Sequence, residues 1–92
     1  MELYHWDPEK NKRLVEERGI SFEEIVAHIE QGDLLDVVRS RNERYKHQMQ
    51  FVVKIMDYVY VVPFVDTGNE IFLKTIFPSR KMTKEYLEKG EN

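Results

Sequence analysis

The fold is decided by two short stretches, Tyr4-His5-Trp6-Asp7-Pro8-Glu9-Lys10-Asn11 and Arg18-Gly19-Ile20-Ser21-Phe22-Glu23-Glu24-Ile25. Asp7 is a good N-cap because its carboxylate can accept hydrogen bonds from the free amides of a first helical turn. Pro8 fits the next position, where no amide hydrogen is needed. Gly19 is a typical residue just past a helix end. The first stretch therefore predicts a helix over residues 8–18.

A second helix is expected directly after that glycine. Ser21 and Glu24 have capping-box spacing, in which each side chain bonds the backbone amide of the other residue. Apolar residues then recur with helical period at Phe22, Ile25, Val26 and Ile29. The pattern predicts an amphipathic helix from Phe22 to about Gln31, and its apolar stripe must pack on another layer.

The chain after these helices is rich in Val, Ile, Tyr and Phe, which favour strands. Strand-like segments cover residues 34–38, 48–56, 58–65 and 70–77, and residues 2–6 alternate like a short first strand. Asp66-Thr67-Gly68-Asn69 is a strong hairpin turn, and Asp57 marks another tight connection. Pro63 cannot donate to a ladder, so an edge position or a bulge is expected there.

Short links between these segments predict a mainly antiparallel sheet of four to five strands. The two N-terminal helices should pack on one face of it. A short C-terminal helix should follow, with an apolar side made by Met82, Tyr86 and Leu87. The expected fold class is therefore α+β.

Length and composition limit the kinds of protein that this chain can be. Ninety-two residues suit a single domain, taken as residues 1–92. There is no cysteine, so neither a disulfide framework nor a thiolate metal site is available. No apolar run approaches a membrane span, and the first residues do not resemble a signal peptide. We expect a cytoplasmic protein.

Charge is unevenly distributed along the chain. The net charge is −3, which argues against indiscriminate binding to a polyanion. Residues 1–36 hold ten acidic and four basic side chains, for −6, whereas residues 37–92 hold ten basic and seven acidic ones, for +3. The second half thus contains the candidate anion-binding side chains, although a solvated strand edge has a similar composition.

The N-terminal phrase resembles the opening of the BrnT-like toxins of bacterial type II toxin–antitoxin systems. That opening is Trp-Asp-x-x-Lys-Asn, followed by Gly-Ile/Val-Ser-Phe-Glu-Glu. This chain matches it with Trp6, Asp7, Lys10, Asn11 and the run from Gly19 to Glu24. The resemblance implies the small α+β fold of the RelE superfamily.

Two later segments extend the resemblance over nearly the whole chain. Thr75-Ile76-Phe77-Pro78-Ser79-Arg80-Lys81 is similar to the family's last strand and the Ser-Ala-Arg segment that follows it. Glu43-Arg44-Tyr45 resembles a mid-chain arginine segment of the family. Where the family usually has an arginine just before the last-strand segment, this chain has Thr75 preceded by Lys74.

The chemistry implied by the resemblance is RNA cleavage without a metal or other cofactor. Such cleavage needs a base for the 2′-hydroxyl, a cation for the phosphorane charge and an acid for the leaving oxygen. The candidate catalytic residues are Arg80, Arg44 and His47. Arg80 occupies the position of the Ser-Ala-Arg arginine, and an arginine can grip phosphate through two hydrogen bonds. The candidate substrate-binding residues are Lys74, Lys81, Lys46 and Tyr86.

Each candidate also has a structural interpretation. Arg80 can be a cap or salt-bridge residue at the start of the last helix. His47 can be an ordinary surface residue of a strand, and Tyr86 can be a core residue of the closing helix. The three histidines lack metal-ligand spacing with a carboxylate, so no metal site is expected.

The leading hypothesis is the toxin component of a type II toxin–antitoxin system, a metal-independent ribonuclease that cleaves mRNA and inhibits translation. A cognate protein antitoxin would neutralise it, and operator DNA would be bound only through that antitoxin. The alternative is a degenerate toxin-like domain that binds RNA or a protein partner without catalysis. That alternative predicts salt-dependent RNA binding with no cleavage.

Overall fold

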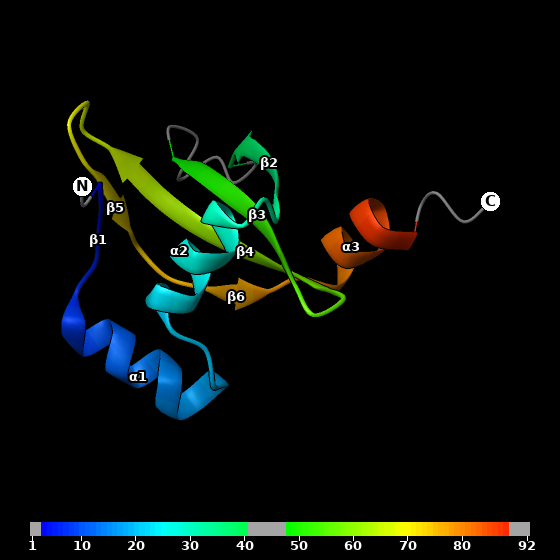
Figure 1. The fold of residues 1–92 in the computed structure, drawn as a ribbon, viewed down its shortest axis with the longest axis horizontal. Helices are drawn as coiled ribbons and strands as arrows, with labels where there is room; N and C mark the ends of the chain where they lie inside the picture. The colour runs from blue at the N-terminus through cyan, green and yellow to red at the C-terminus, as the bar shows by residue number, and fades with distance from the viewer. Residues whose placement is uncertain (1–2, 41–47, 89–92) are drawn as a thin grey trace.

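The computed structural model describes residues 3–40 and 48–88. Its elements, in chain order, are β1 (Tyr4–His5), α1 (Pro8–Arg18), α2 (Phe22–Glu30), β2 (Leu34–Arg39), β3 (Met49–Ile55), β4 (Tyr58–Asp66), β5 (Ile71–Leu73), β6 (Phe77–Pro78), α3 (Arg80–Thr83) and the π-helical segment η2 (Lys84–Glu88) (Figure 1). The predicted α+β class is confirmed, with two N-terminal helices, a sheet and a short C-terminal helix.

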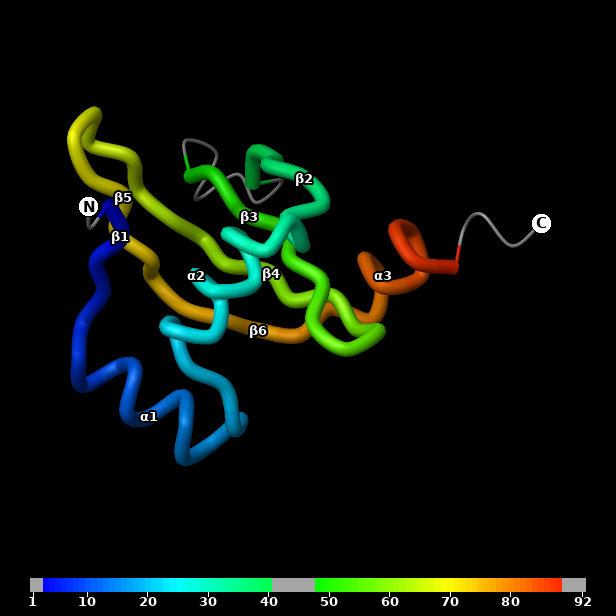
Figure 2. Tube along the Cα trace, viewed as in Figure 1, coloured from blue at the N-terminus to red at the C-terminus, as the bar shows by residue number. Residues whose placement is uncertain are grey.

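The strands form one sheet in the order β1-β5-β4-β3-β2, and β6 pairs with β4 beyond the end of β5. Among the described strands every pairing is antiparallel except that of β1 with β5. The chain from β5 to β6 runs alongside β4 (Figure 2). The sequence predicted one strand over residues 70–77, and the structure divides it in two.

A change of register separates β5 from β6. Phe64 pairs with Leu73 and Val61 pairs with Phe77, so three steps along β4 face four steps along the opposite segment. One extra residue between two paired positions is the mark of a β-bulge. The ladder is therefore irregular between Lys74 and residue 76.

This irregularity explains how Pro63 fits inside the sheet. The Lys74 amide donates to the Pro63 carbonyl at 2.8 Å. In an antiparallel ladder the nitrogen and carbonyl of one residue face the same neighbour, so the proline nitrogen faces the interrupted segment. The predicted bulge is confirmed beside Pro63. The edge position is wrong, because β4 lies between β3 and β5.

The helix caps form as the sequence predicted. The Glu9 amide donates to Asp7 Oδ1 at 3.0 Å, and Gly19 ends α1 in the left-handed conformation with φ +69°. Ser21 and Glu24 form a complete capping box at the start of α2. These local bonds fix where α1 ends and α2 begins.

Asn11 ties the two helices together. Its side-chain oxygen accepts from the Phe22 amide at 2.7 Å, and its side-chain nitrogen donates to Glu23 Oε1 at 2.8 Å. The Phe22 amide belongs to the first turn of α2, where amides have no partner within the helix. The Trp-Asp-x-x-Lys-Asn motif therefore stabilises the start of α2 through Asn11, in addition to capping α1 through Asp7.

The core lies between α1, α2 and one face of the sheet, which we call the front face. Alternation along the strands puts Phe51, Val53, Val62 and Phe64 on this face. They pack with Leu14, Ile20, Phe22, Ile25, Leu73 and Ile76 in one buried cluster. Trp6 stacks on Phe22 with ring centroids 5.5 Å apart, so it anchors the entry to α1.

The opposite surface, which we call the back face, contains Gln50 and Val52 of β3 with Val61 and Pro63 of β4. Helix α3 and η2 cover one end of it. Thr83, which is buried, accepts from the Val59 amide at 2.9 Å and donates to the Ser79 carbonyl at 2.7 Å.

Both predicted tight turns of the sheet are present. Met56 and Asp57 have φ of 50° and 67° between β3 and β4, as a two-residue turn with positive φ at both positions requires. Between β4 and β5, Gly68 has φ +99° and its amide donates to Asp66 Oδ1 at 2.8 Å.

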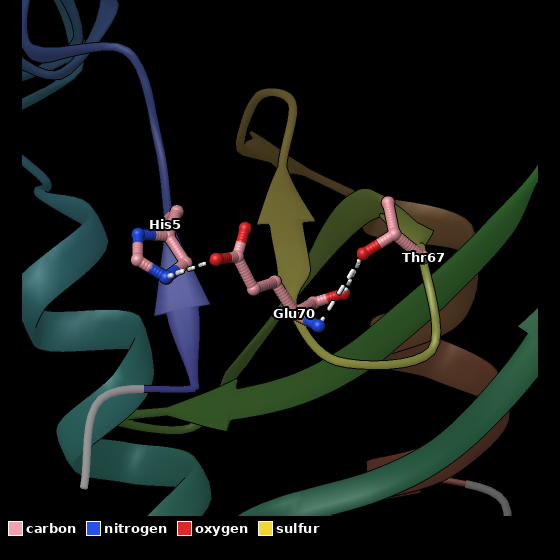
Figure 3. A network of polar contacts seen from close by, with 3 residues as sticks. All are labelled: His5, Thr67 and Glu70. Carbon is pink, nitrogen blue, oxygen red and sulfur yellow. Dashed lines mark hydrogen bonds and ion pairs between the residues drawn. The ribbon is translucent and has the colours of Figure 1, made fainter.

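His5 fastens β1 to the turn between β4 and β5 (Figure 3). Its Nε2 lies 3.7 Å from Glu70 Oε2. Glu70 in turn exchanges hydrogen bonds with Thr67: the Thr67 hydroxyl and amide both donate to the Glu70 carbonyl, at 3.2 and 2.9 Å. The His5 side chain is 43% exposed and faces this carboxylate, so it lies outside the core.

Candidate functional site

The open end of the back face holds a groove of about 370 Å³. Its described lining consists of Ser40, Gln48, Gln50, Pro63, Lys74, Thr75 and Phe77. The groove exists because α3 and η2 cover only the other end of this face, where Val52, Val59 and Val61 are buried. It lies beside the bulge that separates β5 from β6.

The register of the sheet fixes the order of side chains in the groove. Gln50 pairs with Pro63, and Pro63 accepts the backbone bond of Lys74, so these three residues form one row across β3, β4 and the segment between β5 and β6. Neighbouring strands are about 4.8 Å apart, which puts Gln50 and Lys74 about 10 Å apart across the groove. Gln48 is two positions from Gln50 and its side chain therefore lies on the same face, about 7 Å along the strand.

Three side chains of the groove, those of Gln48, Gln50 and Lys74, can bond a ligand. The side-chain amides of Gln48 and Gln50 form no hydrogen bond with any described residue, and the Lys74 ammonium forms no ion pair with one. Lys74 Nζ lies 5.7 Å from the centre of the Phe72 ring, which is 37% exposed. No carboxylate is present among the described lining residues. The groove thus suits an anionic ligand that also offers hydrogen-bonding edges.

Tyr86 lies at a second, more open hollow of about 540 Å³, with Asp36, Lys84 and Glu85. Its hydroxyl donates to Asp36 Oδ2 at 2.7 Å, which ties η2 to β2 across the back face. The side chain is half-buried. Tyr86 is therefore neither a fully buried core residue nor part of the groove.

Arg80 and Lys81 are exposed on the first turn of α3. The capping role belongs to Ser79, whose hydroxyl accepts from the Met82 amide at 3.1 Å. Neither cation forms an ion pair within residues 3–40 and 48–88. The Ser79 amide donates to the Val59 carbonyl, so the backbone of Arg80, the next residue, lies at the covered end of the back face. Lys74 lines the groove at the other end.

Arg44, Lys46 and His47 lie outside the described residues. Their segment joins Ser40 to Gln48, and the Ser40 amide donates to the Gln48 carbonyl at 2.8 Å. Ser40 and Gln48, the described residues that flank the segment, both line the groove.

The sequence reasoning missed Gln48 and Gln50 as functional candidates. The available signal was two amides at alternate positions leading into a strand that is otherwise apolar up to Lys54. Alternation puts such residues on one face. Which helix covers that face depends on tertiary structure, so the amides alone did not reveal a groove.

The described part of the chain has neither a group of side chains suited to a metal ion nor a helix suited to crossing a membrane. His, Asp and Glu side chains there form no group of three or more that could hold a metal ion. None of the helices there combines the length and apolar character that crossing a membrane requires.

Comparison with known proteins identifies a family. A family model described as the ribonuclease toxin BrnT of a type II toxin–antitoxin system matches residues 6–85. No curated protein and no solved structure matches the chain. The matched range contains the caps, the whole sheet from β2 to β6 and the start of the C-terminal helix.

Proposed function

This chain belongs to the BrnT family of ribonuclease toxins from type II toxin–antitoxin systems, and we propose that it cleaves mRNA on the back face of its sheet. The observation that supports the activity is the family match over residues 6–85. The observation that supports the location is the groove, which combines one unpaired ammonium, two amides and no carboxylate among its described residues. Inhibition of translation follows from the loss of messages.

RNA binding at this face is supported by the distribution of charge. The first 36 residues, which build α1 and α2, have a net charge of −6, and the remaining 56 have +3. A polyanion is therefore repelled from the helical layer and attracted to the other side of the molecule. Lys74 in the groove and Lys81 on α3 supply phosphate contacts at two places along one strand of RNA, and Lys46 supplies a third.

We assign the chemistry to the cations and acids of the chain itself. Arg80 stabilises the negative charge that develops on the phosphorane, because a guanidinium donates two hydrogen bonds in a fixed plane. Arg44 has the same role or positions the substrate. His47 is the base or acid, since an imidazole changes charge near neutral pH. The Tyr86 hydroxyl already donates to Asp36, so in this proposal Tyr86 contacts RNA through its aromatic ring.

Membership of a type II system implies a cognate protein antitoxin. In this proposal the antitoxin covers the back face and so excludes RNA from the groove. Operator DNA is bound through the antitoxin, because the toxin chain itself is acidic overall.

The first test is growth of a bacterial host after induction of the chain alone, with total RNA analysed in parallel. We expect arrest with fragmented messages, and we expect Arg80→Ala to restore growth. Arg13→Ala is the matched control, because Arg13 is an exposed arginine on α1, in the helical layer. Arrest that persists in Arg80→Ala at equal protein level would contradict the role of Arg80.

A second test addresses the metal. Purified protein and a defined mRNA are incubated with an excess of EDTA, and we expect cleavage to continue at the same rate. Cleavage that stops and returns on addition of Mg²⁺ would refute metal independence. Intact RNA in both conditions, from folded protein that also permits normal growth, would support the alternative of a binding domain without catalysis.

A further inference from the structure

We propose that the groove binds one unpaired nucleobase through the side-chain amides of Gln48 and Gln50, while Lys74 holds the neighbouring phosphate. The inference rests on the proposed function and adds to it a substrate class and a means of selectivity. The substrate is single-stranded RNA, in which a base can leave its stack and enter the groove edge first.

The spacing of the three side chains fits one nucleotide and its phosphate. Gln48 and Gln50 project from the same face of one segment, and Lys74 lies on the far side of β4 in the row of Gln50. The volume of about 370 Å³ is within the range of pockets that hold small ligands. Phe77 provides an aromatic surface in the lining, on which a base can stack.

The chemistry of the lining favours a base over other ligands. A carboxamide offers one acceptor and a pair of donors in a plane, which matches the paired donor and acceptor edges of a nucleobase. A cationic ligand has no described carboxylate to meet in the groove, and a wholly apolar ligand would leave two amides and an ammonium unpaired. A nucleotide satisfies the amides and the ammonium together.

Binding to the RNA phosphates alone would not use the side-chain amides of Gln48 and Gln50. Phosphate contacts come mainly from cations and carry no information about sequence. Gln48 and Gln50 are half-buried, lie in the groove and have no described partner, and among the described lining residues Lys74 is the one cation. The two amides are therefore the groups that distinguish one base from another.

The experiment measures binding of four ten-nucleotide homopolymers, of A, C, G and U, by fluorescence anisotropy. The oligonucleotides contain 2′-O-methyl groups, so they cannot be cleaved and binding is measured apart from catalysis. The parent protein should prefer one base by about fivefold or more, the discrimination expected of a paired amide contact. Gln50→Ala and Gln48→Ala should bring the four affinities within about twofold of one another.

Two control variants distinguish the contribution of base recognition to RNA affinity from that of phosphate binding. Gln31→Ala, at an exposed glutamine that ends α2, should keep the preference of the parent. Lys74→Ala should weaken all four oligonucleotides alike and lower the slope of log affinity against log salt by about 0.7.

The outcomes distinguish this inference from the function on which it rests. Equal affinity of the parent for all four bases, or a preference that survives in both Gln50→Ala and Gln48→Ala, would overturn base reading while leaving RNA cleavage intact. A preference that these variants abolish would support it, even if Arg80→Ala proved as toxic as the parent. Variants that keep the base preference but no longer bind the antitoxin would show a protein-docking groove and overturn the inference.

Discussion

Side-chain amides on the helical front side are hydrogen-bonded within the chain, whereas those in the groove of the back face have no described partner. On the front side, the Asn11 amide donates to Glu23 and accepts from the Phe22 backbone, and Ser21 and Glu24 cap each other. On the back, Gln48 and Gln50 are amides of the same chemistry with no described partner. Among the described residues no buried polar side-chain atom lacks a hydrogen bond. Unpaired amides therefore occur where solvent or a ligand can reach them.

The same contrast holds for aromatic residues. Phe22 is fully buried against Trp6, while Phe72 on the back is 37% exposed beneath the Lys74 ammonium. The residues that identify the family at the N-terminus thus build the fold. The residues that we propose as ligand contacts lie in the second half of the chain, where the family resemblance is carried by shorter segments.

The largest effect is expected from truncating a buried front-face aromatic. Phe22→Ala should lower the free energy of unfolding by about 3–5 kcal/mol, because a large cavity remains in a fully packed core. Phe72→Ala, the matched change on the back, should cost at most about 1 kcal/mol. Urea unfolding followed by circular dichroism measures both.

A small protein can lose its fold altogether in Phe22→Ala. Phe22→Leu, which keeps most of the volume, is then the informative variant, with an expected cost of about 1 kcal/mol. Phe72→Leu is its matched control and should change stability by less than about 0.5 kcal/mol, so equal costs for Phe72→Leu and Phe22→Leu would show that the two faces do not differ in packing as the structure indicates.

The second effect concerns the hydroxyl that holds the closing helix on the back face. Thr83→Val should cost about 1–3 kcal/mol, because the Val59 amide loses its buried acceptor while the side-chain volume is nearly unchanged. Thr75→Val in the groove is the control and should change stability by less than about 0.5 kcal/mol. The same urea titration applies, and a stable Thr83→Val would mean that packing and the remaining hydrogen bonds, such as that from the Ser79 amide to the Val59 carbonyl, hold α3 without this hydroxyl.

The third effect compares two carboxamides directly. Asn11→Ala should cost about 1 kcal/mol of stability, since the first turn of α2 loses a side-chain acceptor, and should leave RNA affinity unchanged. Gln50→Ala should leave stability within about 0.5 kcal/mol and change the base preference. Unfolding and oligonucleotide binding are measured on both proteins. If the two variants behaved alike in both measurements, the contrast between the faces would fail.

Features that arise from neighbours in the sequence were predictable. The caps at Asp7 and Ser21 and the stop at Gly19 depend on residues at most four positions away, so α1 and α2 were found with their bounds nearly correct. The turns between β3 and β4 and between β4 and β5 were also predicted, because each depends on a few adjacent residues. Resemblance in short motifs then gave the family, which the match over residues 6–85 confirms.

Features that arise from pairing across the sheet were not predictable. The division of residues 70–77 into β5 and β6 depends on the register against β4, and nothing within that segment encodes it. The groove depends on that bulge and on how far α3 and η2 extend over the back face. The candidate residues Lys74 and Arg80 consequently lie near different parts of β4, because the Lys74 amide bonds Pro63 whereas the amide of Ser79, next to Arg80, bonds Val59.

The smallest effect is a dependence on pH at the front face. Burial raises the pKa of Tyr4 above its ordinary value of 10.0, and the negative charge of Glu30 adds to the rise. The folded state therefore holds the phenol proton more tightly than the unfolded chain does. The resulting stability is fully present below the unfolded pKa and is lost as the pH rises through the folded one.

Tyr4→Phe removes this titration, because phenylalanine has no proton to lose. Its free energy of unfolding should fall less than that of the parent between about pH 9 and about pH 11, and Glu30→Gln should give an intermediate slope. Urea titrations at several pH values measure the slopes. Parallel slopes for Tyr4→Phe and the parent would show that Tyr4 is as well solvated as in the unfolded chain, and so that the front face is open to water where β1 joins the core.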